Sequence, residues 1–138
     1  MAEGAGGAAL DVLLVEDEMA LAVMYRIKLS AAGHVVRIAH DGPTGLREAL
    51  ERPPDVLLLD IGLPGFDGLA LLARLREDAR GERVPVIVLS NYGEPEVVAR
   101  GAELGALGHL IKAQTTPASL AQTIGELIVG SAAGLAGT

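Results

Sequence analysis

Four places in this chain carry side chains that could do chemistry together. They are the acidic run at residues 16–18, made of Glu16, Asp17 and Glu18, then Asp60, Ser90 and Lys112. Each place follows a short apolar run, at residues 12–15, 56–59, 84–89 and 110–111. If these side chains meet, carboxylates, a hydroxyl and an ammonium share one crevice. Such a set could bind a hard divalent cation and carry a phosphoryl group on an aspartate.

The apolar runs read as strands, because helical patterns separate them. Strands are predicted at residues 10–15, 35–39, 55–60, 84–90 and 108–111, and helices at 18–31, 41–50, 67–79, 94–104 and 117–129. This alternation indicates an α/β fold with a parallel sheet covered on both faces, and right-handed crossovers favour the doubly wound form. Ligands of such sheets bind beyond the carboxyl ends of the strands. The four places are therefore expected to line one site.

The first predicted helix has apolar positions at helical spacing. The face expected to be buried consists of Ala20, Val23, Ile27 and Ala31. Met19 and Met24 are expected to pack with the same helix, and Gly33 is expected to end it.

Length and composition predict one domain that covers residues 10–130 of the 138. Residues 1–9 are expected to be a flexible N-terminus, and residues 131–138 a disordered tail. We expect neither a membrane span nor a secretory signal, which favours a cytoplasmic location. The net charge of −7 and the scarcity of aromatic residues argue against direct nucleic-acid binding.

Neighbouring carboxylates repel one another, and this repulsion raises their pKa values. A Mg²⁺ ion reverses that effect, because it prefers about six oxygen ligands. Asp17 and Asp60 are suited to direct ligation, Glu16 to ligation through water, and the backbone carbonyl of Gly62 to a further ligand position. Lys112 would offset the remaining charge and pair with a phosphoryl oxygen.

Each residue also has an ordinary structural explanation when it is considered alone. Acids favour helix N-termini. Asp60 could cap the loop that follows it, Ser90 could cap the next helix, and Lys112 could be a solvated strand end. The coincidence of complementary types at four predicted strand ends favours the chemical interpretation.

Four segments resemble the receiver domains of two-component response regulators, and they occur in that family's order. They are residues 12–18 (VLLVEDE), 58–68 (LLDIGLPGFDG), 86–90 (VIVLS) and 105–112 (GALGHLIK). The resemblance covers about residues 10–130. It implies a flavodoxin-like three-layer sandwich, with five strands ordered 2-1-3-4-5 and five helices. It also implies a module of signal transduction that is not a classical enzyme. Because the sequence shows no output domain, we expect a stand-alone receiver or, alternatively, a receiver cut from a longer chain.

The resemblance implies that Asp60 accepts a phosphoryl group from a phosphohistidine. The donor would be a sensor histidine kinase or a histidine phosphotransfer protein. Asp17 and Asp60 would bind Mg²⁺, Ser90 would be the hydroxyl switch and Lys112 would anchor the phosphoryl group. The change would be read by a downstream protein at the face formed by residues 94–130.

The chain departs from the family pattern near the expected site. Ala113 replaces the usual proline, so the Lys112–Ala113 bond could be trans. His109 stands where a tyrosine or phenylalanine usually rotates, so the switch could be sensitive to pH; alternatively, His109 is an ordinary exposed histidine. Asn91 could narrow access for the donor, Tyr92 could shield the acyl phosphate, and Gly62 borders the same opening.

The predicted fold is compatible with three other functions. A flavin carrier needs hydroxyls and glycines after the first strand to cradle a phosphate, and this chain has acids there. An aspartate-based phosphatase needs a general acid at the position of Gly62, which cannot donate a proton. The serious alternative is a receiver-like adaptor that binds partners without phosphorylation. Ala113 and Asn91 keep that alternative open.

Overall fold

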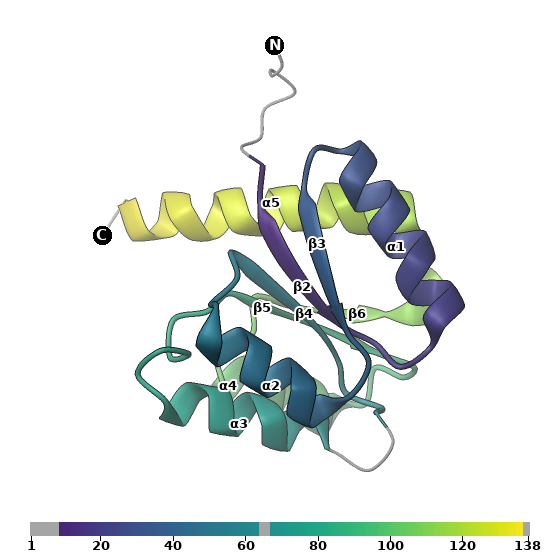
Figure 1. The fold of residues 1–138 in the computed structure, drawn as a ribbon. Helices are drawn as coiled ribbons and strands as arrows, with labels where there is room; N and C mark the ends of the chain where they lie inside the picture. Colours follow the sequence, from purple (N-terminus) through teal and green to yellow (C-terminus); the bar gives the residue numbers. More distant parts are fainter. Residues whose placement is uncertain (1–8, 64–66, 137–138) are drawn as a thin grey trace.

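The computed structural model describes residues 9–63 and 67–136 (Figure 1). The predicted flexible N-terminus, apart from Ala9, lies outside these residues. The same holds for residues 64–66 of the second family-like segment and for residues 137–138 of the predicted tail.

The described residues contain one parallel sheet of five strands. The strands are β2 (Asp11–Val15), β3 (Val35–Ala39), β4 (Val56–Asp60), β5 (Val86–Ser90) and β6 (Gly108–Ile111). Their order in the sheet is β3-β2-β4-β5-β6, which is 2-1-3-4-5 in chain order and confirms the prediction. The central strands β4 and β5 are buried along their whole length, as expected for strands covered on both faces.

Five α-helices cover the two faces of this sheet in the described chain. They are α1 (Met19–Ala31), α2 (Gly42–Glu51), α3 (Gly68–Glu77), α4 (Pro95–Glu103) and α5 (Pro117–Ala136), and a short 3₁₀ helix η1 (Lys112–Gln114) precedes α5. Figure 1 shows α1 and α5 on one face, and α2, α3 and α4 on the other. Two apolar cores fill the spaces between these layers. The predicted three-layer sandwich is confirmed. Among the described residues, none of the helices has both the length and the apolar character needed to cross a membrane.

Local sequence signals explain where several helices begin and end. Asp41 caps α2, because its Oδ1 accepts a hydrogen bond of 2.7 Å from the amide of Thr44. Thr116 and Ser119 cap α5 reciprocally, with the Ser119 amide donating to Thr116 Oγ1 at 3.0 Å. Gly33 follows α1 with a φ of 98°, a conformation that glycine adopts readily, so the predicted end of this helix is confirmed.

The face of α1 predicted to be buried is wrong. The buried residues of α1 are Ala22, Tyr25 and Leu29, which share the other apolar stripe of the helix. Ile27, Met19 and Met24 are instead exposed, by 63%, 57% and 54%. Both stripes are apolar, so residue type and spacing alone do not distinguish them. Packing against the sheet therefore selected between them.

The predicted disordered tail is wrong for residues 131–136, which continue α5 as far as Ala136. The prediction rested on the small size of these residues. Three of the six are alanines, which have the highest helix propensity of any residue. A helix that is already nucleated is extended by such residues at little cost.

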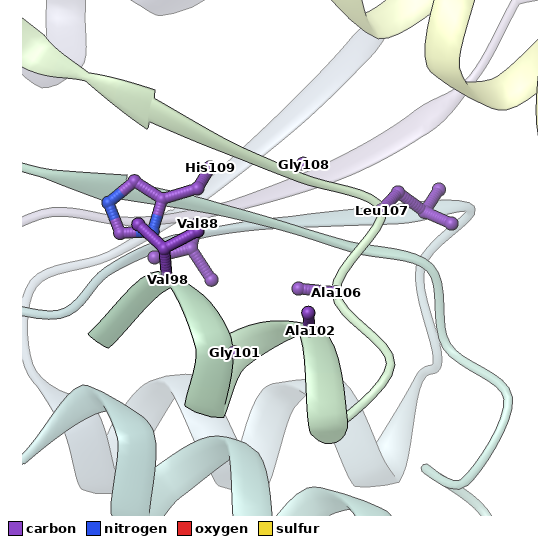
Figure 2. Close-up of a pocket in the computed structure, with 8 residues that line it drawn as sticks. All are labelled: Val88, Val98, Gly101, Ala102, Ala106, Leu107, Gly108 and His109. Atoms are coloured by element: carbon purple, nitrogen blue, oxygen red, sulfur yellow. The ribbon is translucent and has the colours of Figure 1, made fainter. Parts of the chain in front are cut away.

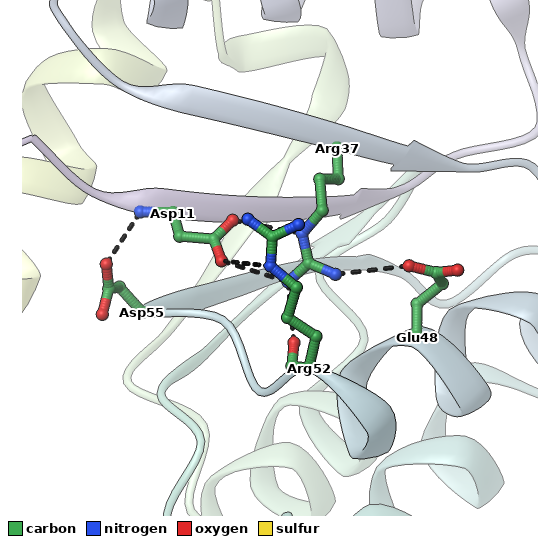
Figure 3. Close-up of polar contacts among 5 residues, drawn as sticks. All are labelled: Asp11, Arg37, Glu48, Arg52 and Asp55. Atoms are coloured by element: carbon green, nitrogen blue, oxygen red, sulfur yellow. Dashed lines mark hydrogen bonds and ion pairs between the residues drawn. The ribbon is translucent and has the colours of Figure 1, made fainter.

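An ion-pair network fixes the end of the sheet opposite the candidate site (Figure 3). Arg37 on β3 binds Asp11 on β2 at 3.1 Å and Glu48 on α2 at 3.3 Å. It also donates to the backbone carbonyl of Arg52 at 2.7 Å. Asp55, just before β4, accepts a hydrogen bond of 2.7 Å from the Asp11 amide. These contacts connect β2 and β3 with α2 and with the residue before β4, away from the carboxyl ends of the strands.

Candidate functional site

Glu16, Asp60 and Lys112 meet at the carboxyl ends of three strands. Glu16 follows β2, Asp60 ends β4, and Lys112 follows β6. The ammonium nitrogen Nζ of Lys112 lies 2.9 Å from Asp60 Oδ2 and 3.1 Å from Glu16 Oε1. The side chain of Lys112 is only 14% exposed. The alternative of a solvated strand end is therefore wrong for Lys112.

Asp17 completes a cluster of carboxylates around the same point. One carboxylate oxygen from each of Glu16, Asp17 and Asp60 lies within 4.8 Å of the others. Glu16 is fully buried and Asp60 nearly so, whereas Asp17 is exposed. Three hard oxygen donors, one of them open to solvent, match the preference of Mg²⁺ for carboxylates together with several waters. The residues fit such an ion.

The electrostatics of the cluster follow from its crowding. Burial, together with the negative charge of Asp60, raises the pKa of Glu16 to about 7. Burial acts to lower the pKa of Lys112, but the hydrogen bond and charge of Asp60, and then those of Glu16, raise it above the ordinary value. The buried negative charge is thus compensated by one ammonium. A divalent cation would compensate it more completely.

Gly62 lies beside Asp60 in the loop that follows β4. Its amide donates a hydrogen bond of 2.9 Å to Asp60 Oδ1, so Asp60 does cap this loop. The role predicted for the Gly62 carbonyl as a metal ligand stays a prediction. The peptide bond between Lys112 and Ala113 is trans, and η1 begins at that lysine.

Ser90 makes two hydrogen-bond contacts, with Tyr92 and His109. Its Oγ lies 2.6 Å from the carbonyl oxygen of Tyr92 and 2.6 Å from His109 Nε2. A carbonyl can only accept, so the single hydroxyl proton goes to Tyr92, and His109 Nε2–H donates to Ser90. Ser90 does not cap the next helix, because Glu94 is the N-cap of α4. His109 is not an ordinary exposed histidine, because it is half-buried.

His109 also borders a small apolar cavity between α4 and the sheet (Figure 2). The cavity has a volume of about 150 Å³. Its other lining residues are Val88, Val98, Gly101, Ala102, Ala106, Leu107 and Gly108. Figure 2 shows the His109 ring next to Val88 and Val98. The small residues on α4 and before β6 leave space beside the histidine.

Asn91 and Tyr92 lie on the loop between β5 and α4. Both are exposed, and the side chain of Tyr92 is 73% exposed. They directly follow Ser90 in the chain. The predicted effects of Asn91, Tyr92 and Gly62 on donor access and on phosphoryl lifetime stay predictions.

The sequence argument missed Tyr25, which the structure buries completely on the sheet face that carries Glu16. The spacing of Ala22, Tyr25 and Leu29 could have indicated this burial. It fits one face of a helix as well as the spacing of the residues that were predicted to be buried.

The comparisons with known proteins agree with this geometry. The family model described as the response regulator receiver domain matches residues 12–124. The chain belongs to this family, whose members are signalling modules of two-component systems. The chain is 39% identical over 111 residues to the phosphate regulon transcriptional regulatory protein PhoB of Rhizobium meliloti. The aligned region covers 80% of this chain and 49% of that protein. The chain is also 35% identical over 118 residues to a gliding motility regulatory protein of Myxococcus xanthus, and the aligned region covers 86% of this chain and 15% of that protein. The chain spans half or less of the length of these relatives.

Solved structures of receivers have the same fold. The chemotaxis protein CheY4 of Vibrio cholerae superposes with a TM-score of 0.79 at 28% identity, over 87% of this chain and 99% of that one. The receiver domain of the Francisella response regulator 1452 gives a TM-score of 0.78 at 26% identity, over 88% and 98%.

Proposed function

We propose that the chain accepts a phosphoryl group on Asp60 from a phosphohistidine and signals through a change in protein binding. The P–N bond of the donor breaks as a P–O bond forms to a carboxylate oxygen of Asp60, and the donor imidazole takes up a proton. A sensor histidine kinase or a histidine phosphotransfer protein would supply the group. The exchange would take place in the cytoplasm, the location predicted from the sequence.

One observation carries this proposal: the ammonium of Lys112 reaches Asp60 and Glu16 while Asp17 adds a third carboxylate. A nucleophilic Asp60 must be ionised and near a cation that can take over the charge of the incoming phosphoryl oxygens. Lys112 Nζ lies 2.9 Å from Asp60 Oδ2 and would contact the oxygens of a phosphoryl group carried on that residue. Glu16, Asp17 and Asp60 would hold Mg²⁺, which when bound neutralises charge on the transferred group.

The exposed face of α1 offers a docking surface for the donor. Met24 and Ile27 are more than half exposed, and Val23, next to Ile27 on the same side of the helix, is partly exposed. This stripe runs along the helix that starts two residues after Asp17. Exposed apolar stripes of this kind are typical of contact sites for an amphipathic partner helix. A donor helix on α1 would bring its histidine toward the acidic cluster.

Ser90, His109 and α4 would carry the readout. A phosphoryl group on Asp60 would attract the Ser90 hydroxyl, which would have to leave Tyr92 and His109. The C-terminal end of α4 is held by Arg76, which donates to the carbonyls of Leu104 at 2.6 Å and Gly105 at 3.3 Å. Movement is therefore expected at the N-terminal end of α4 and at His109, on the face formed by residues 94–130. A downstream protein would bind there.

Incubation with Mg²⁺ and acetyl phosphate, followed by intact-mass measurement, tests the proposal. The wild-type chain should gain about 80 Da, the mass of one phosphoryl group on an acyl oxygen. The Asp60→Asn variant should gain nothing, while Asp55→Asn, at the opposite end of the sheet, should behave as wild type. The absence of a gain in the folded wild-type chain, with acetyl phosphate and with a phosphorylated histidine donor, would favour the adaptor instead.

A further inference from the structure

Tyr25 places a buried phenol on the side of the sheet where the acidic cluster lies. It is fully buried on α1, in the core that also contains Leu14 and Leu58. Side chains alternate along a strand, so Glu16 continues the face of Leu14, and Asp60 continues the face of Leu58. The phenol and the two carboxylates therefore project into the same layer, between the sheet and α1.

Two polar atoms in this layer are left without a hydrogen bond among the described residues. They are the hydroxyl of Tyr25 and Oε1 of Glu16, and both are buried. Lys112 approaches Glu16 Oε1 at 3.1 Å, but it donates its hydrogen bond to Oε2, at 3.3 Å. Unpaired buried donors and acceptors are costly. These two atoms are complementary, because the phenol donates and the carboxylate accepts.

We propose that Tyr25 is a positioning residue of the metal site: its hydroxyl donates to Glu16 and fixes that carboxylate when a divalent cation occupies the cluster. This inference rests on the proposed function, since it names a further residue of the same site. The charge of Glu16 supports it, because after burial itself this charge is the largest cause that raises the pKa of Tyr25. The phenol is thus within electrostatic reach of the carboxylate.

The consequence for the cluster concerns orientation. Glu16 has several rotatable bonds. The amide of Glu18 donates to Oε2 at 3.1 Å, and Oε1 has only the ion-pair contact with Lys112 at 3.1 Å. A hydrogen bond from Tyr25 to Oε1 would restrict this oxygen further and keep the carboxylate in the cluster with Asp17 and Asp60. Groups that orient metal-binding carboxylates in this way typically change metal affinity by about 10- to 100-fold.

The chain itself offers a sensitive test, because Tyr25 and Tyr92 are its two tyrosines and it has no tryptophan. In a Tyr92→Phe background, Tyr25 alone absorbs in the tyrosine band. Titration with MgCl₂ should shift this band to longer wavelength, as expected when a phenol donates to a carboxylate. The Tyr25→Phe variant, which keeps the exposed Tyr92, should show no shift. This readout leaves Tyr25 in place and does not depend on whether Tyr25→Phe folds.

Calorimetric titration with MgCl₂ gives the second readout. Tyr25→Phe should bind Mg²⁺ about tenfold more weakly than wild type, with a melting temperature that is unchanged or higher, because it removes an unpaired buried hydroxyl. Equal Mg²⁺ affinity for Tyr25→Phe and wild type, or an unshifted band in Tyr92→Phe, would overturn the role of Tyr25. A wild-type chain that binds no Mg²⁺ would instead overturn the proposed metal site.

Discussion

Lys112 and Asp60 are 52 residues apart in the chain, and their side chains meet at 2.9 Å at the carboxyl edge of the sheet. The same ammonium contacts Glu16, so one cation compensates two buried carboxylates. A pair of this kind contributes little net stability as a whole, but the loss of one partner leaves buried charge uncompensated. This relationship makes Lys112 informative about both stability and metal binding.

Lys112→Met is expected to lower the free energy of unfolding of the metal-free chain by about 3 kcal/mol, because Glu16 and Asp60 would lose their cation. Removal of a positive charge from the cluster should also tighten Mg²⁺ binding. Urea unfolding with and without MgCl₂ measures both effects. Lys28→Met, on the exposed side of α1, is the matched control and should change neither quantity. Unchanged stability in Lys112→Met would mean that the ion pair is absent in solution.

His109 is expected to carry its proton on Nε2 in the unphosphorylated chain, because Ser90 gives its own proton to the Tyr92 carbonyl. Long-range ¹H–¹⁵N spectra distinguish the two tautomers. Ser90→Ala should move the Nε2 resonance of His109, while Ser30→Ala, on the exposed side of α1, should not. A proton found on Nδ1 instead would contradict the donation from His109 Nε2 to Ser90 Oγ.

His34 is expected to make stability depend on pH. Its Nδ1 accepts a hydrogen bond of 3.1 Å from the amide of Leu10, which only the deprotonated nitrogen can do. Burial lowers the pKa of His34 below its ordinary value. The unfolded chain therefore takes up the proton more readily, so this contribution to stability is present above about pH 6.5 and is lost as the pH falls below it.

Urea unfolding between pH 5 and pH 8 measures this dependence. The free energies of unfolding of His34→Gln and wild type should become more similar as the pH falls, because the wild type loses the contribution of His34 and glutamine does not titrate. His40→Gln, at an exposed position, should keep the wild-type slope. Parallel curves for wild type and His34→Gln would show that His34 does not contribute.

Two glycines are expected to respond in opposite directions to the same substitution. A Cβ at Gly68, at the start of α3, would clash with the backbone of Ile61 and lie 2.8 Å from its Cβ. Ile61 directly follows Asp60, so Gly68→Ala should cost about 2 kcal/mol and slow phosphorylation of Asp60. A Cβ at Gly125 in α5 meets nothing within 4 Å, so Gly125→Ala should stabilise the chain by about 1 kcal/mol. Urea unfolding and the acetyl phosphate assay measure these effects.

Local patterns in the sequence were sufficient for a parallel sheet covered on both faces and for the meeting of Glu16, Asp60 and Lys112, whereas the strand order was implied by the family resemblance. Buried apolar strands that alternate with helices have few possible arrangements, and each arrangement places the carboxyl ends of neighbouring strands together. The starts of α2 and α5 were also predictable from local sequence, since the caps Asp41 and Thr116 act on amides only a few residues away.

Tertiary packing decided what local patterns left equivalent. Both stripes of α1 are apolar, and only the sheet beneath the helix determined that Tyr25 is buried and Ile27 exposed. The pairing of Ser90 with His109 depends on the register of β5 against β6, in which Val88 lies opposite His109. Side-chain direction and hydrogen-bond partners of this kind depend on distances between segments remote in sequence. Residue type and spacing along one segment do not contain those distances.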